Sequence, residues 1–403
     1  MTNSRICAVR CSLLGLFVTA LSLRSAAGQS TFRDSAGVRL TPITLRGHTG
    51  VLKLSPRPTI DIGGAPGDSS YDLNRVRGAV RLHDGTIVVA NNNPQQLRFF
   101  DARGRFIRTA GRKGNGPGEF QSLTHLWALR GDTLLVFDAP AQRISLFRSN
   151  GDHLSTQILV APKGRRQPTI LGAFADQRLL AGSSDVQTAP PRATPYYFGQ
   201  HVFIYGLDGQ PGQDVGPFTE SEHFVQHTVP EHGGTAYWDL AYGRRTSIVA
   251  RGNEVIVGDG TTFELRSFTR AGRLQEIWRA LTAPERLTER ERAAYRADAL
   301  KGLAPSGRAI EEKRLDEMPY PALIPAFKRF FVADDGRIWI QRYTHVGESQ
   351  ERWVVLDGHG QFLDELTMPA RFSLWAAGAG YVLGGYHDED DIEHVQEFTL
   401  ASG

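Results

Sequence analysis

The sequence contains 403 residues, of which 40% are hydrophobic and 22% are charged, and it carries 43 Gly, 21 Pro and 2 Cys. This composition supports a sizeable globular core and excludes intrinsically disordered, collagen-like and disulfide-stapled proteins. The net charge is only +3, from 46 Lys and Arg against 43 Asp and Glu. Such a balance offers no broad attraction to polyanions, so we expect no nucleic-acid partner.

The first 28 residues have the pattern of a secretory signal peptide. Arg5 and Arg10 precede an apolar stretch at residues 12–23, and small residues follow at 25–28. The apolar stretch is shorter than the roughly 20 residues that a transmembrane helix needs, and no later segment comes closer. We therefore predict a signal peptide at 1–28, no transmembrane segment, and a mature protein that is periplasmic or secreted.

Both cysteines, Cys7 and Cys11, lie within this predicted signal peptide. A lipoprotein signal needs small or aliphatic residues before its cysteine, whereas Cys11 follows Arg10, so we expect no lipid anchor. Cleavage near Gly28 leaves a mature chain without thiols, which excludes disulfides, thiolate metal sites and cysteine nucleophiles.

A short pattern then recurs six times along the chain. Each copy has an apolar run typical of a strand, a turn, and a glycine that supplies the positive φ of a tight hairpin. The recurring glycines are Gly104, Gly151, Gly209, Gly272, Gly360 and Gly403. Further hairpins are predicted upstream, for example around Asp84-Gly85 and Asp335-Gly336. Four short strands in a unit of about 45 residues are typical of a propeller blade, so we predict an all-β, six-bladed β-propeller.

The two ends of the chain are expected to close the propeller together. The sequence ends after the third strand of the sixth unit, and residues 59–68 resemble residues 108–119, which follow the fourth strand of the first unit. An N-terminal strand should therefore supply the missing fourth strand, which removes an exposed sheet edge. The predicted boundaries are an N-terminal extension at 29–57 and a propeller at 58–403.

One interval between repeats is longer than the others and differs in character. Residues 282–285 and 288–291 have capping-box patterns, and apolar residues follow at helical spacing among charges. A second helix is expected over 308–317. The alternative is a hidden seventh blade, but the segment lacks strand alternation and a repeat-type turn glycine. We predict a helical insert at about 282–318, between blades 4 and 5.

Two segments carry a family resemblance: residues 111–120, GRKGNGPGEF, after the first blade, and the closing stretch at 381–400. On the basis of these segments, the chain resembles bacterial exported six-bladed propeller proteins of the NHL/TolB-like kind. The resemblance extends across nearly the whole mature sequence. The resemblance implies the propeller fold. It implies no particular activity, because propellers of this kind include binders, lyases and hydrolases.

The glycine-rich loop at residues 114–119 could suggest a phosphate cradle. Such cradles place backbone amides at a helix N-terminus and end in Lys followed by Ser or Thr, whereas this loop joins two predicted strands. We favour a tight connection between blades, in which Glu119 accepts hydrogen bonds from nearby amides.

Three histidines, His223, His227 and His232, lie between the third and fourth units with glutamates beside them. Neutral imidazole and carboxylate suit Zn²⁺ or a similar ion, and some propeller lyases hold a metal in the central channel. The spacing matches no recognised ligand signature, however, and a solvated polar loop is the alternative. We expect no cofactor, with one divalent Zn²⁺ or Ca²⁺ ion as the alternative.

The acidic run at residues 388–391 could also suggest a Ca²⁺ site. It lacks the glycine-spaced, alternating ligands of a calcium loop, so a solvated hairpin turn is preferred.

A set of mostly basic residues marks the candidate binding site. Alignment on the hairpin turns places them near the start of the innermost strand in five blades, at Arg77, His125, Arg245, Arg329 and Arg371. Innermost strands line the channel of a propeller, so these residues should face its mouth. Guanidinium groups bind carboxylate, phosphate or sulfate through paired hydrogen bonds. The alternative is that their stems pack between blades and their charges pair with local carboxylates.

No residues with the pattern of a catalytic site stand out. Neither Gly-x-Ser-x-Gly nor His-Glu-x-x-His occurs in the sequence. Trp127, Trp339 and Trp375 fall on inner or second strands, where bulky side chains fill the wedge between blades, and we assign them to packing.

These observations favour a monomeric exported scaffold. It would bind a small molecule, anionic if the basic residues form a site, or an envelope protein at the channel mouth. The alternative is a metal-dependent hydrolase or lyase, lactonase-like or NHL-lyase-like, whose ion in the channel is held by residues among His125, His223, His227 and His232.

Overall fold

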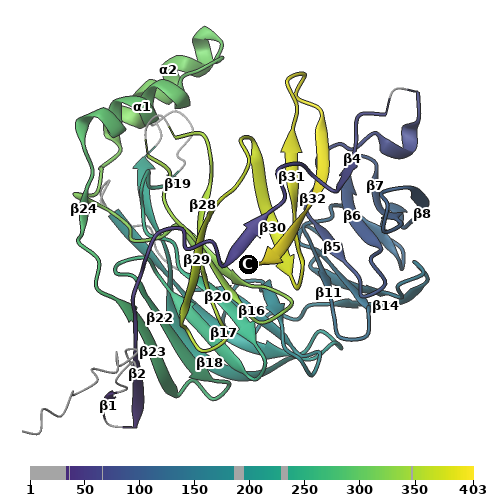
Figure 1. The fold of residues 1–403 in the computed structure, drawn as a ribbon, viewed down its shortest axis with the longest axis horizontal. Coiled ribbons are helices and arrows are strands. Elements are labelled where there is room, and N and C mark those ends of the chain that lie inside the picture. Colours follow the sequence, from purple (N-terminus) through teal and green to yellow (C-terminus); the bar gives the residue numbers. More distant parts are fainter. Residues whose placement is uncertain (1–32, 36, 66, 186–194, 228–234, 346–347) are drawn as a thin grey trace, which may run out of the picture. The chain divides into compact units, whose positions relative to one another are not determined.

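The computed structural model describes residues 33–35, 37–65, 67–185, 195–227, 235–345 and 348–403. The predicted signal peptide at 1–28 lies outside these residues. Within them, the strands form successive antiparallel sheets in chain order (Figure 1). The first strands of blades 1 and 2, 3 and 4, 4 and 5, and 6 and 1 lie in contact, so the first strand of each blade is the innermost.

Blades 1, 2 and 5 are sheets of four antiparallel strands in sequence order. Blade 1 consists of β5 (Ala79–Arg81), β6 (Ile87–Asn92), β7 (Gln95–Phe100) and β8 (Phe106–Ala110). Blade 2 consists of β11 (His125–Ala128), β12 (Leu134–Asp138), β13 (Arg143–Phe147) and β14 (His153–Ile158). Blade 5 consists of β26 (Arg329–Val332), β27 (Ile338–Gln341), β28 (Arg352–Leu356) and β29 (Phe362–Thr367).

The other three blades carry additional strands. Blade 3 consists of β15 (Thr169–Ala173), β16 (Leu179–Ser184), β17 (Pro195–Tyr205), β18 (Pro211–His227) and β19 (Thr235–Asp239). Blade 4 consists of β20 (Ser247–Arg251), β21 (Glu254–Gly258), β22 (Glu264–Thr269) and β23 (Leu274–Ala280), joined by β1 (Arg33–Ser35) and β2 (Val38–Ile43). Blade 6 consists of β30 (Phe372–Gly378), β31 (Tyr381–His387) and β32 (Glu393–Ser402), joined by β3 (Leu52–Leu54) and β4 (Ile60–Ile62).

Six clusters of buried side chains hold the blades together, one between each neighbouring pair. The cluster between blades 1 and 2 contains Val88 and Val136. The cluster between blades 6 and 1 contains Leu383 and Val89, so the ring closes. Trp339 is fully buried between blades 5 and 6, which confirms its predicted packing role. The chain is therefore an all-β, six-bladed propeller, as the sequence predicts.

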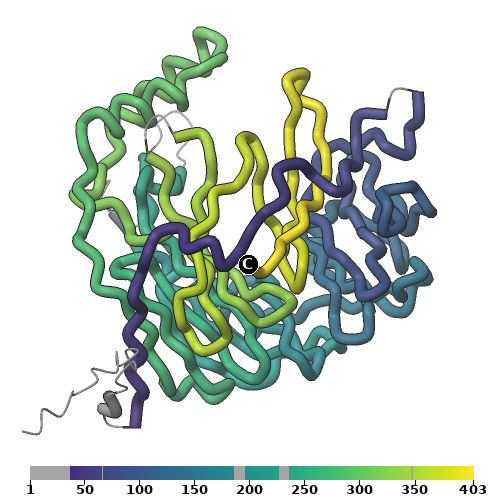
Figure 2. Tube along the Cα trace, viewed as in Figure 1, coloured from purple at the N-terminus to yellow at the C-terminus, as the bar shows by residue number. Residues whose placement is uncertain are grey.

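The N-terminal segment completes the sheet of blade 6. Strand β4 pairs antiparallel with β32, placing Ile62 opposite Val395, and β3 continues this pairing with Leu54 opposite Leu400. Figure 2 shows this segment beside the C-terminus. The pairing of the two chain ends in one blade is the closure that the sequence predicts, and it covers the edge of the last strand.

A second N-terminal pairing differs from the sequence analysis. Strand β2 lies parallel to β23 of blade 4, with Leu40 opposite Ile277, and β1 pairs with β2. Residues 29–57 were expected as an extension, yet 38–43 and 52–54 are strands of the blade sheets. The buried side chain of Ile43 joins the core cluster between blades 4 and 5, and β2 satisfies the open edge of β23.

The insert before blade 5 consists of α1 (Glu289–Ala299) and α2 (Pro305–Glu317), bracketed by the paired strands β24 (Glu285–Arg286) and β25 (Leu323–Ile324). The Thr288 hydroxyl accepts the Glu291 amide, and the Glu291 carboxylate accepts the Thr288 amide at 2.8 Å, which is the predicted capping box. Residues 282–285 begin no helix. The segment folds as two helices, which excludes a seventh blade there.

The helices are held by a seventh cluster of buried side chains. It joins Leu300 and Leu315 of the insert to Phe224 of β18 and to Leu240 in the connection after β19. This cluster lies apart from the six that hold the blades together.

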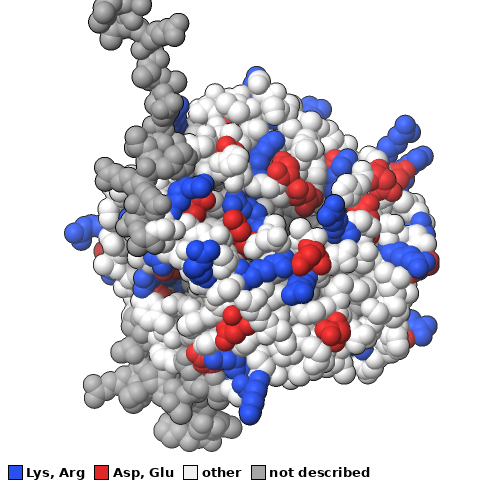
Figure 3. All heavy atoms as spheres, turned by 90° about the horizontal axis from the view of Figure 1, so that it is seen from below, with Lys and Arg blue, Asp and Glu red and all other residues white. Residues whose placement is uncertain are grey.

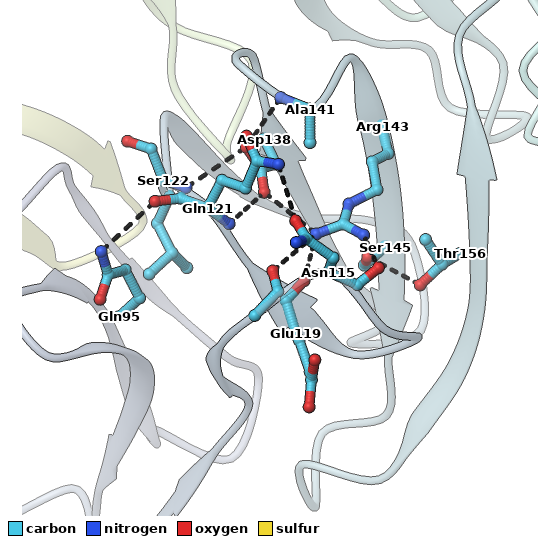
Figure 4. A network of polar contacts seen from close by, with 12 residues as sticks. Gln95, Asn115, Glu119, Gln121, Ser122, Asp138, Ala141, Arg143, Ser145 and Thr156 are labelled. Carbon is cyan, nitrogen blue, oxygen red and sulfur yellow. Dashed lines mark hydrogen bonds and ion pairs between the residues drawn. The ribbon is translucent and has the colours of Figure 1, made fainter.

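A polar network holds the connection between blades 1 and 2, which contains the short parallel strands β9 (Arg112–Lys113) and β10 (Glu119–Phe120) (Figure 4). The amide of Gly116 donates to Glu119 Oε2 at 2.9 Å. Arg143 of blade 2 donates to the carbonyl oxygens of Asn115 and Glu119 at 2.5 and 2.7 Å. Glu119 is thus the amide acceptor that the sequence predicts. A short 3₁₀ turn, η1 (Ser69–Tyr71), precedes blade 1.

Candidate functional site

The innermost strands begin on one face of the propeller, because they line the channel side by side in the same direction. Four of the five predicted site residues precede or start these strands in blades 1, 2, 4 and 5, and Arg371 precedes the strand of blade 6. The connection that carries α1 and α2 leads into β26, so it reaches the same face. All five residues therefore lie within two residues of the start of an innermost strand. They do not share one backbone position: the amides of Arg77 and Lys328 donate to the carbonyls of Ala90 and Gln341, so Lys328, and not Arg329, corresponds to Arg77.

The channel contains a cavity of about 420 Å³, which is large enough to hold one small molecule. Segments of blades 1, 2, 5 and 6 form its walls. We call it the channel cavity, and the lining residues that matter below are Arg77, Arg81, His125, Trp127, Arg329, Phe331, Asp334 and Trp375. The cavity brings together three of the five predicted site residues.

Arg77 is the least constrained of these three. Its amide donates to the Ala90 carbonyl at 3.0 Å, which fixes the backbone at the cavity wall. Its guanidinium is exposed and makes no hydrogen bond or ion pair within the described part of the chain. It is therefore available to an anion in the channel.

His125 lies beside Arg77 at the start of β11. Its ring stacks on the Trp127 ring, with centroids 5.2 Å apart and planes 16° apart. Desolvation by the channel walls lowers the pKa of His125 below 6.5, and the positive charge of Arg77 lowers it further. The imidazole is accordingly neutral at neutral pH, and it becomes a cation only in acid.

Arg329 is fixed more firmly than Arg77. Its Nε donates to Gln341 Oε1 at 2.7 Å and its Nη2 donates to the Leu374 carbonyl at 2.9 Å. The guanidinium also lies over the Trp353 ring, 5.0 Å from the centroid. The alternative from the sequence, that these arginines pack between blades, thus describes Arg329 in part: its guanidinium bonds Gln341 of blade 5 and Leu374 of blade 6, and the residue also lines the cavity.

The cavity has a further polar side formed by residues that the sequence analysis did not single out. The Tyr381 hydroxyl donates to Asp334, and burial raises the pKa of that carboxyl. Arg81 pairs with Glu397 at 3.0 Å and lies over the Tyr381 ring. These charges are largely satisfied within the protein, unlike that of Arg77.

A second cavity of 640 Å³ lies next to the first, and we call it the groove. Its polar and aromatic lining comes from blade 3, α1, the connection before blade 4, and blade 5 with the residue that precedes it: Glu220, Asp239, Tyr242, Arg245, Tyr295, Lys328, Arg329 and Tyr343. Arg329 lines both cavities. The sequence analysis missed Lys328 because it took one residue per blade and chose the neighbouring Arg329. It missed the tyrosines because they lie in connections and on α1, not on the innermost strands.

The remaining two predicted residues lie outside the channel cavity. Arg245 lines the groove, where its guanidinium pairs with Asp239. Arg371 is exposed in the turn before β30 with φ of 62°, and it lines neither cavity. The structure therefore divides the five predicted site residues into three groups. Arg77, His125 and Arg329 line the channel cavity, Arg245 lines the groove, and Arg371 lies on the surface.

The predicted histidine cluster is described only in part. His223 contacts Ser221 Oγ at 2.6 Å and Asp239 Oδ1 at 3.3 Å, and burial lowers its pKa. His227 follows four residues later on β18, about 13 Å along a strand. The side chain of His227 and all of His232 lie outside the described residues. Among the residues that are described, no three His, Cys, Asp or Glu side chains are grouped as a metal site would need.

The acidic run at 388–391 forms the turn between β31 and β32. Asp388 accepts hydrogen bonds from the amides of Asp390 and Ile392 at 3.0 and 2.8 Å. Its carboxylate closes the hairpin, as preferred from the sequence.

Surface charges are mixed in sign. On the face in Figure 3, Lys and Arg alternate with Asp and Glu over the described residues. Ion pairs such as Arg270 with Asp176, at 2.7 Å, neutralise many of them. In the described part of the chain, no helix combines the length and the apolar character that crossing a membrane requires.

Comparison with known proteins supports the fold. A family model described as "6-bladed beta-propeller" (DUF5128) matches residues 71–159. No curated protein matches the chain. The resemblance to bacterial six-bladed propeller proteins, expected from the sequence, is confirmed at this level.

Three solved structures illustrate the likeness. A candidate exported protein from Bacteroides fragilis NCTC 9343 is 11% identical, with 90% of this chain and 99% of that chain covered and a TM-score of 0.48. A DUF4221 member from Bacteroides vulgatus ATCC 8482 is 10% identical, with 88% and 99% covered and a TM-score of 0.49. A gluconolactonase from Xanthomonas campestris is 12% identical, with 89% and 99% covered and a TM-score of 0.43. Likeness at this level carries no argument about function.

Proposed function

We propose that this propeller is an exported binding protein that takes a small anionic ligand in the channel cavity. One observation carries the proposal: the guanidinium of Arg77, which has no partner among the described residues, shares a 420 Å³ cavity with Arg329 and His125. Arginine recognises carboxylate, phosphate and sulfate through paired, charge-assisted hydrogen bonds. Export is proposed from the signal-peptide pattern at residues 1–28.

The size and walls of the cavity narrow the class of ligand. Its volume falls within the range of about 300–1,000 Å³ that is usual for small-molecule sites. Trp127 and Trp375 supply aromatic surface, while Arg77 and Arg329 supply positive charge. A molecule with a ring or apolar part and one acidic group matches this combination.

The proposal is tested by equilibrium titration of the mature chain, residues 29–403. Tryptophan fluorescence follows binding, because Trp127 and Trp375 line the cavity. The probes are galacturonate, citrate, phosphate and sulfate, with galactose as the neutral counterpart. At least one anion should bind, and Arg77→Gln should weaken it about tenfold or more, since a hydrogen bond to a charged group contributes about 1.5–3 kcal/mol.

The matched control is Arg103→Gln, which removes an exposed arginine on the turn between β7 and β8. It should leave binding unchanged. No binding of any anion, or equal losses in both variants, would contradict the proposal.

The alternative function, a metal-dependent hydrolase or lyase, has a separate test. An enzyme of that class should purify with about one equivalent of metal and melt at lower temperature after chelation, because an ion bound only to the native state stabilises it. The proposed binding protein should show an unchanged melting curve.

A further inference from the structure

We propose that the ligand is an acidic oligosaccharide, which places one acidic sugar in the channel cavity and further sugars in the groove. This inference rests on the proposed function of the channel cavity and deepens it. The starting observation is that the two cavities, of 420 and 640 Å³, share the side chain of Arg329. Each alone has room for one small molecule, so a ligand that fills both consists of several linked units.

The groove presents aromatic rings in the manner that sugar rings require. The Tyr242 ring stacks against the Tyr343 ring, with centroids 6.2 Å apart and planes 29° apart, and Tyr295 of α1 lies 6.1 Å from Tyr242. All three side chains are half-buried. Tyr242 and Tyr295 also pack against the seventh cluster, and the Tyr343 hydroxyl donates to the Gly243 carbonyl at 2.9 Å, so these rings are fixed in place. The part of each ring that lines the groove offers an apolar surface that complements the C–H face of a sugar.

Positive charge continues from the channel into the groove. Lys328 directly precedes Arg329, and its ammonium makes no hydrogen bond or ion pair within the described residues. Burial by the surrounding groove lowers the pKa of this amine. Arg77 is the corresponding unpaired cation of the channel cavity. Lys328 and Arg77, which have no partners among the described residues, thus lie in adjoining cavities, and Arg329 lines both. This arrangement indicates a ligand with repeated negative charge.

The groove also contains acceptors that a purely anionic ligand would not use. Glu220 and Asp239 line it together with Ser221. Carboxylates repel carboxylates but accept hydrogen bonds from hydroxyl groups. A ligand with acidic groups, hydroxyl groups and sugar rings would pair with the cations, the acceptors and the aromatic rings of the groove. A uronic-acid oligosaccharide has this combination. An acidic peptide could donate to these carboxylates only through its backbone N–H groups, and it has no sugar ring for the tyrosines to contact.

The test is calorimetric titration of the mature chain with galacturonate, digalacturonate and trigalacturonate. The trimer should bind at least about tenfold tighter than the monomer, because its linked units occupy the second cavity at high effective concentration. Lys328→Gln and Tyr242→Ala should remove most of this gain and leave the affinity for the monomer within about twofold of the unmodified protein.

Lys313→Gln on α2 is the matched control, since Lys313 is exposed and lines neither cavity. It should behave as the unmodified protein does. Melting curves check that Tyr242→Ala keeps the propeller folded, and limited proteolysis within 282–318 checks that the insert stays attached, because Tyr242 packs against the seventh cluster. Lys328→Gln replaces a side chain that has no hydrogen-bond partner among the described residues, so it tests the inference independently.

Three results would overturn the inference. A trimer that binds no tighter than the monomer shows that the groove is not used. A gain that persists in both variants shows that these residues do not provide it. Equal binding of triglutamate, with the same dependence on Lys328 and Tyr242, assigns the groove to an acidic peptide. In each of these three cases, the channel proposal still stands if the monomer binds and its binding depends on Arg77. If the monomer does not bind in this way, the proposed function itself fails.

Discussion

Blades 1 and 2 differ from blades 3 to 5 on the face where the innermost strands begin. The strands of blades 1 and 2 contain six residues at most, and short loops connect them. In blade 3, β18 runs for 17 residues and pairs with the additional strand β19, and two helices precede blade 5. The comparison teaches that the repeated pattern builds the ring and the channel, while departures from the repeat build the groove.

The two regions are also held together differently. Six interblade clusters stabilise the ring, and the seventh cluster attaches the insert to β18 and the connection after it. The insert should therefore loosen without opening the ring, because local stability follows local burial.

The largest effect is expected from the closure of the ring. Ile62 is fully buried between blades 6 and 1, so Ile62→Ala should lower the free energy of unfolding by about 2–5 kcal/mol. Ile310→Ala, at a position on α2 that is 69% exposed, is the matched control and should change it by less than about 0.5 kcal/mol. Denaturant melts provide the measurement, and equal effects would contradict this view of closure.

A substitution in the seventh cluster sharpens the comparison. Leu315 is 2% exposed where α2 meets β18. Leu315→Ala should increase proteolytic cleavage within 282–318 on the order of tenfold, with a smaller shift in the global melt than Ile62→Ala causes. Limited proteolysis followed by mass spectrometry identifies the cut sites. A single cooperative loss of both regions would show that insert and ring unfold together.

Acidification should affect the channel in two opposite ways. The pKa of His125 is lowered in the folded protein, so on acidification the unfolded chain binds a proton at His125 first. Stability is therefore lost as the pH falls from 6.5 through the pKa of the folded state. A bound anion favours the imidazolium, so affinity should rise over the same range. His125→Gln should remove the rise in affinity, measured by titration between pH 5 and 8 as roughly a few-fold change. An unchanged pH dependence would contradict a site at His125.

The smallest effect is expected at Arg371. The sequence alignment placed this residue in the binding site, but in the structure it lies outside both cavities. Arg371→Gln should change anion affinity by less than about twofold, compared with about tenfold for Arg77→Gln. The same titration measures both. Equal losses would show that the ring of five residues, rather than the channel cavity, defines the site.

Local signals explain why much of the fold was predictable. The turn glycines, the apolar alternation and the capping box of Thr288 act within a few residues, so they can be read from sequence. Gly209 is an example: its φ is 78°, and a Cβ there would lie 2.2 Å from the Ile158 carbonyl oxygen. The parallel pairing of β2 with β23 was missed, because the choice between distant open edges leaves no local pattern.

The site was predictable only in part for a related reason. Alignment found the backbone position of Arg245, but its pairing with Asp239 depends on the additional strand of blade 3. Lys328 corresponds to Arg77, but the alignment chose its neighbour Arg329 in blade 5. Tyr343 lies in the connection between β27 and β28, away from the innermost strands. Repeats therefore indicate where a channel begins, whereas the irregular connections decide which side chains share a cavity.

The most direct test of anion recognition in the channel compares galacturonate with its methyl ester, which has the same ring and no charge. The proposed site predicts that the acid binds at least about tenfold more tightly than the ester. Arg77→Gln should reduce this difference to about twofold or less. Equal affinity for acid and ester, or a preference that persists without the Arg77 guanidinium, would contradict the account.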